Sequence, residues 1–269
     1  MTYPTTTDTA STVAFAGSSA GPSAGATPAA TTTLTASAPP AQRLDLYTPI
    51  HKALRAFMTD TLVRLGSMDV DDDDERRRTL DQVDALLAQL KSHLDHENHF
   101  VQTAIEARCP GAGSRTAHEH LDHLESICNL EDECSALRAA RPEQRAALAL
   151  SLYRHLGAFV AENLEHMLVE ERENNAALWA HYSDAELAHV HDLLLASIPP
   201  AEMLHSTRWL VVALSVAELA PMFAAMREKA PPAAFALFLD VAREHMDDVR
   251  WAKLSRALGL APVPGLMTA

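Results

Sequence analysis

The chain has 269 residues, of which 48% are hydrophobic but only 5% aromatic, so its core must be built mainly from alanine, leucine and valine, which favours closely packed helices. Its formal net charge is −14, which argues against a nucleic-acid partner and in favour of a bound cation. No apolar run is long enough to span a bilayer, so no membrane partner is expected.

The first segment, residues 1–40, consists mainly of Thr, Ala, Ser, Gly and Pro and carries one charged residue, Asp8. Such a segment cannot bury enough apolar area to offset its ordering entropy, which predicts a disordered tail. It also lacks the basic and apolar regions of a secretory signal. The three cysteines (Cys109, Cys128 and Cys134) follow no disulfide or zinc spacing, so we expect free thiols and a cytoplasmic location.

Four long stretches with helical hydrophobic periodicity follow, separated by short turn-forming segments. They predict helices over residues 44–66, 78–108, 116–138 and 142–180. Short connections between long helices predict an all-α fold with an up-down-up-down four-helix bundle over residues 41–180. Residues 181–269 contain further capping-box patterns and are expected to form a C-terminal helical extension, which packs on the bundle or binds a protein partner or a second copy of the chain.

One short pattern, a histidine followed four residues later by a glutamate, occurs in both the second and the fourth predicted helix. The pairs are His93 with Glu97 and His166 with Glu170. Residues four apart share one face of a helix, and both pairs fall on the apolar stripe that should face the interior. Two buried carboxylates without cations would cost several kcal/mol each, so we expect a bound divalent metal.

The other two predicted helices also place histidines on their inward stripes. These are His51 on the first helix and His120 and His123 on the third. The candidate ligands are therefore five histidines and two glutamates from four helices. Imidazole with carboxylate suits iron, manganese or zinc more than calcium or magnesium. Two carboxylates that can each span two ions favour a pair of metals over one.

The level of each histidine along its helix can be estimated by counting from the turns. Counted from the turn near Arg141, His166 lies roughly 10 Å beyond the level of His123, at ~1.5 Å per residue. His155 misses that level by a smaller margin on the other side. His166 remains the predicted ligand, because only His166 has a glutamate four residues further on.

This arrangement of histidines and glutamates resembles the hemerythrin-like proteins, also called HHE cation-binding domains, over about residues 44–180. The resemblance implies a four-helix bundle holding two iron ions in a non-haem di-iron centre, bridged by Glu97 and Glu170. The oxygen carriers of that family place two histidines of the third helix four residues apart and use an aspartate on the fourth. Here His120 and His123 are three apart, so the sequence leaves open whether one or both bind.

The expected function is the binding of dioxygen or another small oxidant or diatomic molecule, for sensing, storage or delivery. The sequence shows no separate nucleophile, general acid–base pair or phosphate-binding loop. Two alternatives stay open. One is an enzyme that turns over peroxide, nitric oxide or iron, and the other is a structural helical protein with a single bound metal.

Overall fold

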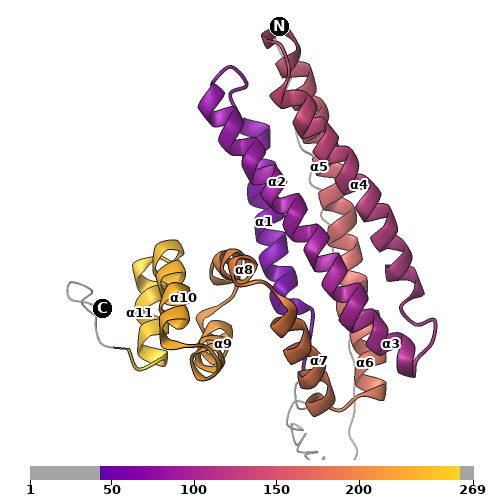
Figure 1. Ribbon diagram of the computed structural model, residues 1–269, viewed down its shortest axis with the longest axis vertical. Helices are drawn as coiled ribbons and strands as arrows, with labels where there is room; N and C mark the ends of the chain where they lie inside the picture. The colour runs from indigo at the N-terminus through magenta and orange to yellow at the C-terminus, as the bar shows by residue number, and fades with distance from the viewer. Residues whose placement is uncertain (1–42, 261–269) are drawn as a thin grey trace, which may run out of the picture. The chain divides into compact units, whose positions relative to one another are not determined.

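The computed structural model describes residues 43–260, and every regular element in that range is a helix (Figure 1). The predicted all-α class is confirmed for these residues, whereas the disordered tail predicted for residues 1–40 lies outside them. None of the described helices is long and apolar enough to cross a membrane. In chain order, the elements are α1 (Thr48–Ser67), α2 (Asp73–His96), the π-helical segment η1 (Glu97–Gln102), α3 (Thr103–Arg108), α4 (Ser114–Arg138), α5 (Pro142–Val169), the π-helical segment η2 (Glu170–Asn174), α6 (Asn175–His181), α7 (Asp184–Ser197), α8 (Pro200–Ala213), α9 (Val216–Lys229), α10 (Pro232–His245) and α11 (Asp248–Ala257).

The first two predicted helices differ from α1 and α2 mainly at their starts. α1 begins later than predicted, at Thr48, because the Asp45 carboxylate accepts a hydrogen bond from the Thr48 backbone N–H at 3.0 Å and ends the preceding loop. α2 begins earlier than predicted, at Asp73. The carboxylate of Asp72 accepts hydrogen bonds from two backbone N–H groups of the first turn, at 2.9 Å each, and so caps the helix.

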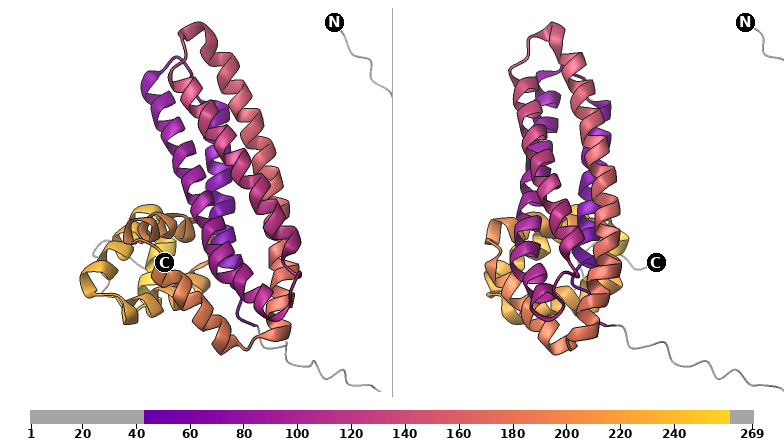
Figure 2. Two further views of the ribbon diagram at one scale, coloured as in Figure 1. Left: turned by 45° about the vertical axis from the view of Figure 1, so that its right-hand side comes forward. Right: turned by 90° about the vertical axis from the view of Figure 1, so that its right-hand side faces the viewer.

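The helices α1, α2, α4 and α5 lie side by side, and both views in Figure 2 show their axes running along one another. α1 packs against α2 and α5, and α4 also packs against α2 and α5. One large apolar cluster fills the space between them, and its most deeply buried members include Phe57, Met58, Leu80, Leu86, Leu87, Ile127, Leu130, Leu137, Leu152 and Leu156. A smaller apolar cluster is built from the residues just before α1 and from η1, α3, α6 and α7, and it includes Tyr47, Val101, Ile105 and Leu178.

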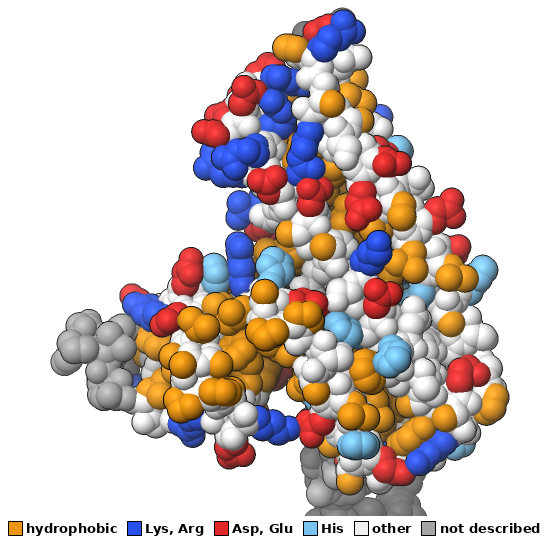
Figure 3. Space-filling view, viewed as in Figure 1, with side chains coloured by type: hydrophobic (Ala, Val, Ile, Leu, Met, Phe, Trp, Pro, Cys, Tyr) orange, Lys and Arg blue, Asp and Glu red, His pale blue; other side chains and the backbone are white. Residues whose placement is uncertain are grey.

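The helices after α7 have an apolar cluster of their own. It is built around Val211, Leu219, Phe223, Ala242 and Leu254, all of which are fully buried. α8 also packs against α1, where the ring of Trp209 stacks on the ring of Phe57 with centroids 4.2 Å apart. On the face shown in Figure 3, hydrophobic side chains gather over these C-terminal helices, while acidic and basic side chains are interspersed elsewhere.

Replacing Phe57 by alanine is expected to lower the free energy of unfolding by about 3–5 kcal/mol. The ring is only 1% exposed, belongs to the large apolar cluster and stacks on Trp209, so its removal leaves a cavity in contact with two helices. Urea unfolding followed by circular dichroism measures the change. Leu121→Ala, at a position 63% exposed, should stay within about 0.5 kcal/mol of the parent, and equal losses in both variants would contradict the assignment.

Candidate metal centre

Each His-x-x-x-Glu pair lies where an α-helix changes to a π-helix. α2 ends at His96 and η1 begins at Glu97, and α5 ends at Val169 and η2 begins at Glu170. Up to each glutamate the backbone keeps its α-helical bonds, so the histidine four residues earlier still shares its face. The following wider turns shift the next residues around the helix axis. Single π-helical turns of this kind often occur at functional sites.

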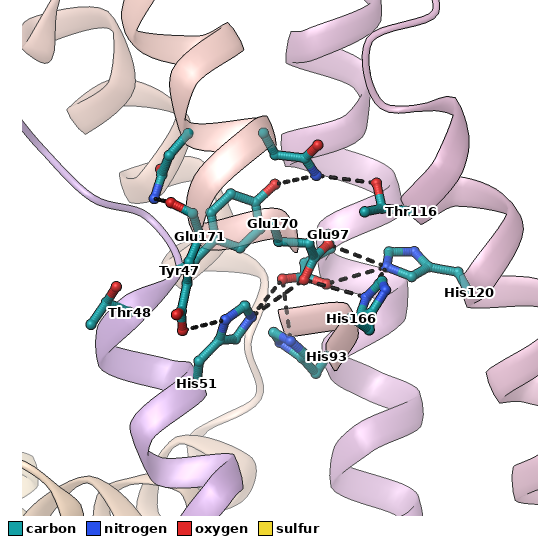
Figure 4. Close-up of polar contacts among 12 residues, drawn as sticks. Tyr47, Thr48, His51, His93, Glu97, Thr116, His120, His166, Glu170 and Glu171 are labelled. Atoms are coloured by element: carbon teal, nitrogen blue, oxygen red, sulfur yellow. Dashed lines mark hydrogen bonds and ion pairs between the residues drawn. The ribbon is translucent and has the colours of Figure 1, made fainter. Parts of the chain in front are cut away.

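Six of the seven predicted ligands lie together in two overlapping groups. The close-up in Figure 4 shows four imidazole rings converging on two carboxylates from four different helices. Within each group, one potential ligand atom per residue lies within 4.8 Å of the corresponding atoms of the others. The first group consists of His51, His93 and Glu97, and the second of Glu97, His120, His166 and Glu170.

In the first group, both histidines approach the same carboxylate oxygen. His51 Nε2 lies 3.4 Å from Glu97 Oε1, and His93 Nε2 lies 3.2 Å from it. His51 Nε2 is also 3.5 Å from Glu170 Oε2, which connects this group to the second one. His51 is completely buried and Glu97 is 3% exposed, so bulk water does not solvate these groups.

In the second group, two histidines face each other beside the two glutamates. His120 Nε2 and His166 Nε2 are 3.1 Å apart. His120 Nε2 also lies 3.6 Å from Glu97 Oε2 and 3.4 Å from Glu170 Oε1, and His166 Nε2 lies 3.3 Å from Glu170 Oε2. Glu97 therefore presents one oxygen to each group of histidines, whereas Glu170 presents Oε1 to His120 and Oε2 to both His51 and His166.

These separations fit metal coordination. Two donor atoms each ~2.1 Å from one ion are ~3.0 Å apart at a right angle and ~3.4 Å apart at a tetrahedral angle. The distances between donor atoms of the cluster, 3.1 to 3.6 Å, are close to that range. Several of these buried atoms make no hydrogen bond within the chain: His93 Nε2, Glu97 Oε2, Glu170 Oε1 and Glu170 Oε2. Buried polar atoms without partners are costly, and a shared cation would satisfy all four.

His123 lies beside the two groups rather than inside them. Its ring is 3% exposed and packs edge-on against the ring of His166, with centroids 4.8 Å apart, and against the ring of Phe159, with centroids 5.8 Å apart. Its Nδ1 atom is buried without a hydrogen-bond partner. Burial, together with the nearby imidazoles of His166 and His120, lowers the pKa of His123 to about 4, so the ring is neutral and its Nδ1 can accept. Its role as a ligand stays a prediction.

Three histidines of the two groups are oriented by hydrogen bonds on the ring nitrogen that faces away from the cluster. The Nδ1–H of His120 donates to Asn98 Oδ1 at 2.7 Å. In the same way His51 Nδ1–H donates to Glu171 Oε1 at 3.1 Å, and His166 Nδ1–H donates to Glu119 Oε2 at 2.8 Å. A proton held on Nδ1 leaves the Nε2 lone pair free to bind a metal, and Nε2 is the atom that faces the cluster in all three rings.

These three hydrogen-bond partners were not predicted from the sequence. Asn98 and Glu171 each follow a ligand glutamate directly, and Glu119 directly precedes His120. Neighbours in sequence point to different faces of a helix, so position alone does not reveal that their side chains reach a histidine on another helix. The only available signal was chemical, since ligand histidines usually donate their second N–H to an oxygen.

A chain of buried hydrogen bonds links the two π-helical segments. Gln102, at the end of η1, donates to Thr116 Oγ1 at 2.6 Å. Asn174, at the end of η2, donates to the same oxygen at 3.1 Å and to the hydroxyl of Tyr47 at 3.2 Å. A side chain at Gly113 would collide with Gln102, whose Oε1 lies 2.0 Å from the position of an added Cβ. A larger residue at position 113 would therefore force Gln102 to move and disturb its hydrogen bond to Thr116.

The metal-free cluster keeps protons that a metal would displace. Burial, reinforced by the charge of Glu97, raises the pKa of Glu170 to about 8. Burial alone would lower the pKa of His51, but its hydrogen bond to Glu171 and the charge of Glu97 raise it to about 9. Burial lowers the pKa of His93 to about 3, so His93 is neutral at pH 7. Without a metal at neutral pH, therefore, Glu170 is protonated and His51 carries a second proton, on Nε2, which a metal ion would displace.

Metal binding at pH 7 is expected to release about two protons per chain, because ligands must be deprotonated before they bind. Both folded-state pKa values lie above 7, so the release should fall as the pH rises through 8 and 9 towards 10. Calorimetric titration of the metal-free protein, in buffers that differ in ionisation enthalpy, measures this number. A proton count near zero at pH 7 would contradict the assignment of these two groups as ligands.

Among the histidines outside the cluster, His155 is the one that counting from the turn brings near the level of His123. It is exposed and bonds Glu133, so it is not the partner of His123. His96 and His99 line an open surface hollow of about 620 Å³ with Asn98, on the outer side of η1. All three cysteines are free, as predicted.

Comparison with known proteins gives no further identification. No protein-family model matches the sequence, and no curated protein matches it either. The site itself is a buried cluster of imidazoles and carboxylates that can hold metal ions.

Proposed function

We propose that this chain is a hemerythrin-like protein, in which α1, α2, α4 and α5 form an up-down-up-down four-helix bundle around a di-iron centre. In this proposal Glu97 and Glu170 bridge the two ions. His51 and His93 bind one ion, and His120, His166 and the adjacent His123 surround the other. The bound pair takes up dioxygen or a related small oxidant or diatomic molecule, for sensing, storage or delivery.

The observation that carries the proposal is the position of Glu97, which belongs to both groups of ligand atoms. Its Oε1 lies near the histidines of the first group, and its Oε2 lies 3.6 Å from His120 of the second group. A carboxylate with one oxygen directed at each of two sites is suited to bridging two ions. A single structural ion would leave one of the two groups of histidines without a partner.

Iron is the metal that we propose, with manganese and zinc as the alternatives that the same donors accept. The cluster combines neutral imidazoles with two carboxylates, a set that suits a redox-active ion with variable charge. When bound, a ferrous pair would supply the electrons for the reversible binding of dioxygen.

The residues of this chain supply orientation and a dry surrounding. The acceptors on Nδ1 hold His51, His120 and His166 with Nε2 towards the cluster. Apolar residues lie on both sides of the site along the helices. Leu54 and Leu94 belong to the large apolar cluster on one side, whereas Tyr47, just before α1, and Val101 of η1 belong to the smaller cluster on the other side. Exclusion of water in this way protects a bound oxidant from stray proton transfer.

The test is elemental analysis of protein purified without added metal, followed by absorption spectra before and after exposure to air. The expected result is about two iron ions per chain and a visible absorption band that appears in air and disappears when oxygen is removed under mild vacuum. His93→Ala should lose the band. About one zinc ion per chain, with no band after anaerobic iron loading, would show a structural metal instead. Repeated consumption of peroxide or nitric oxide by the loaded protein would show an enzyme.

A further inference from the structure

Two ligand histidines share an arrangement that the others lack. His51 Nδ1 bonds the carboxylate of Glu171, and Arg55 Nη1 donates to the same carboxylate oxygen at 2.6 Å. His166 Nδ1 bonds the carboxylate of Glu119, which also accepts a bond from Arg115 Nε at 2.8 Å. Each therefore belongs to a hydrogen-bonded triad of arginine, glutamate and histidine that ends at the metal centre.

Both triads connect different helices. His51 and Arg55 lie one turn apart on α1, and Glu171 reaches them from η2. Glu119 lies on α4, one turn after its arginine, and reaches across to α5. The side chains of Glu171 and Glu119 are 18% and 27% exposed, so they lie between the buried cluster and the surface. The rotamers of both carboxylates are fixed from two sides, which orients the two rings.

The two triads are divided between the two groups of ligand atoms, one triad to each group. One oriented histidine, His51, belongs to the first group of ligand atoms, and the other, His166, belongs to the second group. His120, which is also in the second group, bonds a neutral amide, Asn98, rather than a carboxylate. Each of the two metal positions thus has one imidazole whose second nitrogen faces a negative charge.

A carboxylate that accepts the Nδ1–H bond draws this proton towards itself and increases the electron density at Nε2. The ligand becomes more basic, which strengthens metal binding and stabilises the more oxidised ion. The arginine keeps the carboxylate charged and in place.

We propose that Glu171 and Glu119 are positioning residues that tune the two metal positions separately, each raising the affinity and lowering the reduction potential of one ion. This inference rests on the proposed function, because it assumes that both positions hold a redox-active metal. It goes beyond that function by assigning the control of each position to one carboxylate outside the ligand set.

The variants that test it are Glu171→Gln, Glu119→Gln and the double substitution, because glutamine keeps the shape and removes the charge. Each single variant should bind its iron about 10- to 100-fold more weakly at one of the two positions and show a more positive reduction potential. The double variant should show both losses. Competition with a colorimetric chelator measures affinity, and spectroelectrochemical titration of the iron-loaded protein measures the potential.

Matched controls remove a neighbouring charge without touching a histidine. Glu165 is 78% exposed and its carboxylate lies 3.8 Å from Arg115, so Glu165→Gln is the control for Glu119. Glu173 is an exposed residue of η2, so Glu173→Gln is the control for Glu171. Arg55→Gln, which leaves the carboxylate in place, should shift the potential in the same direction by a smaller amount, and it serves if Glu171→Gln does not fold.

The outcomes separate this inference from the proposed function. If the parent protein binds about two iron ions but both glutamine variants keep the affinity and potential of the control variants, the tuning role is wrong and the proposed function stands. If the parent protein binds no redox-active metal, the proposed function fails and this inference fails with it. A more positive potential in Glu171→Gln and Glu119→Gln, with the controls unchanged, supports both.

Discussion

Glu97→Ala is expected to reduce the metal content from about two ions per chain to near zero, the largest effect of any single substitution at the site. Glu97 is the one residue that belongs to both groups of ligand atoms, so its loss removes a donor from each position and uncovers the charge repulsion between the ions. His93→Ala, by contrast, removes a donor from the first group only. It should leave about one ion per chain.

The measurement is the metal content of purified protein after dialysis against a metal-buffered solution. Asp95→Ala is the control, because Asp95 is an exposed acidic residue of the same helix two positions before Glu97. It should keep the full metal content. A Glu97→Ala protein that retains two ions while folded would show that the carboxylate does not bridge, and the two-ion arrangement would have to be abandoned.

Removal of the metal ions is expected to lower the melting temperature on the order of 20 °C. Binding to the folded state alone stabilises a protein by about 4 kcal/mol per site when the free metal is at 1,000 times its dissociation constant. Two sites give about 8 kcal/mol, and each kcal/mol shifts the melting temperature by about 2–4 °C in a domain of this size. Without the metal, the unpartnered oxygens of Glu170 and the fully buried His51 have to be stabilised by the chain alone.

Differential scanning calorimetry of the metal-loaded and the metal-free protein tests this expectation. The Glu97→Ala variant is the matched control, since its melting temperature should not respond to added iron. Equal melting temperatures for the loaded and metal-free parent protein would mean that the cluster is stable without ions. In that case the buried carboxylates would have to be satisfied by protons and histidines alone.

The sequence could predict that six of the candidate ligands face the interior, because helix periodicity decides which residues share a face. His93 with Glu97 and His166 with Glu170 are four residues apart, and a repeat of 3.6 residues per turn places each pair on one face whatever the rest of the fold does. The inward stripe on which His51 lies is likewise a local property of its helix. The structure shows that these residues are buried, and the apolar pattern around them was enough to predict this.

The level of one helix relative to another was harder to predict from the sequence. Counting from the turn near Arg141 separates His123 and His166 by roughly 10 Å, yet their ring centroids are 4.8 Å apart. The reason is an overhang of α5 beyond the end of α4. Arg138 at the end of α4 pairs with Asp84 of α2. Arg145, near the start of α5, pairs with Asp73, which lies three turns before Asp84 in α2. A turn that lets one helix extend past its neighbour has no local sequence signal.

The hydrogen-bond partners of the candidate ligands could not be predicted from the sequence. Glu119, Asn98 and Glu171 reach histidines on other helices, so their roles depend on packing distances that a single sequence does not contain. The same holds for the link between Gln102, Thr116 and the residues beyond it. Local periodicity identified which residues face inwards, and tertiary packing decided which of them meet.

The π-helical segments η1 and η2 make the spacing of the chain at the site intolerant of length changes. A π-turn holds one residue more than an α-turn, and loss of one residue from Asn98–Gln102 would let the segment return to α-helical bonding. Every later residue of that helix would then rotate by about 100° relative to Glu97. Gln102 would then leave Thr116, so related proteins should keep the number of residues in this segment.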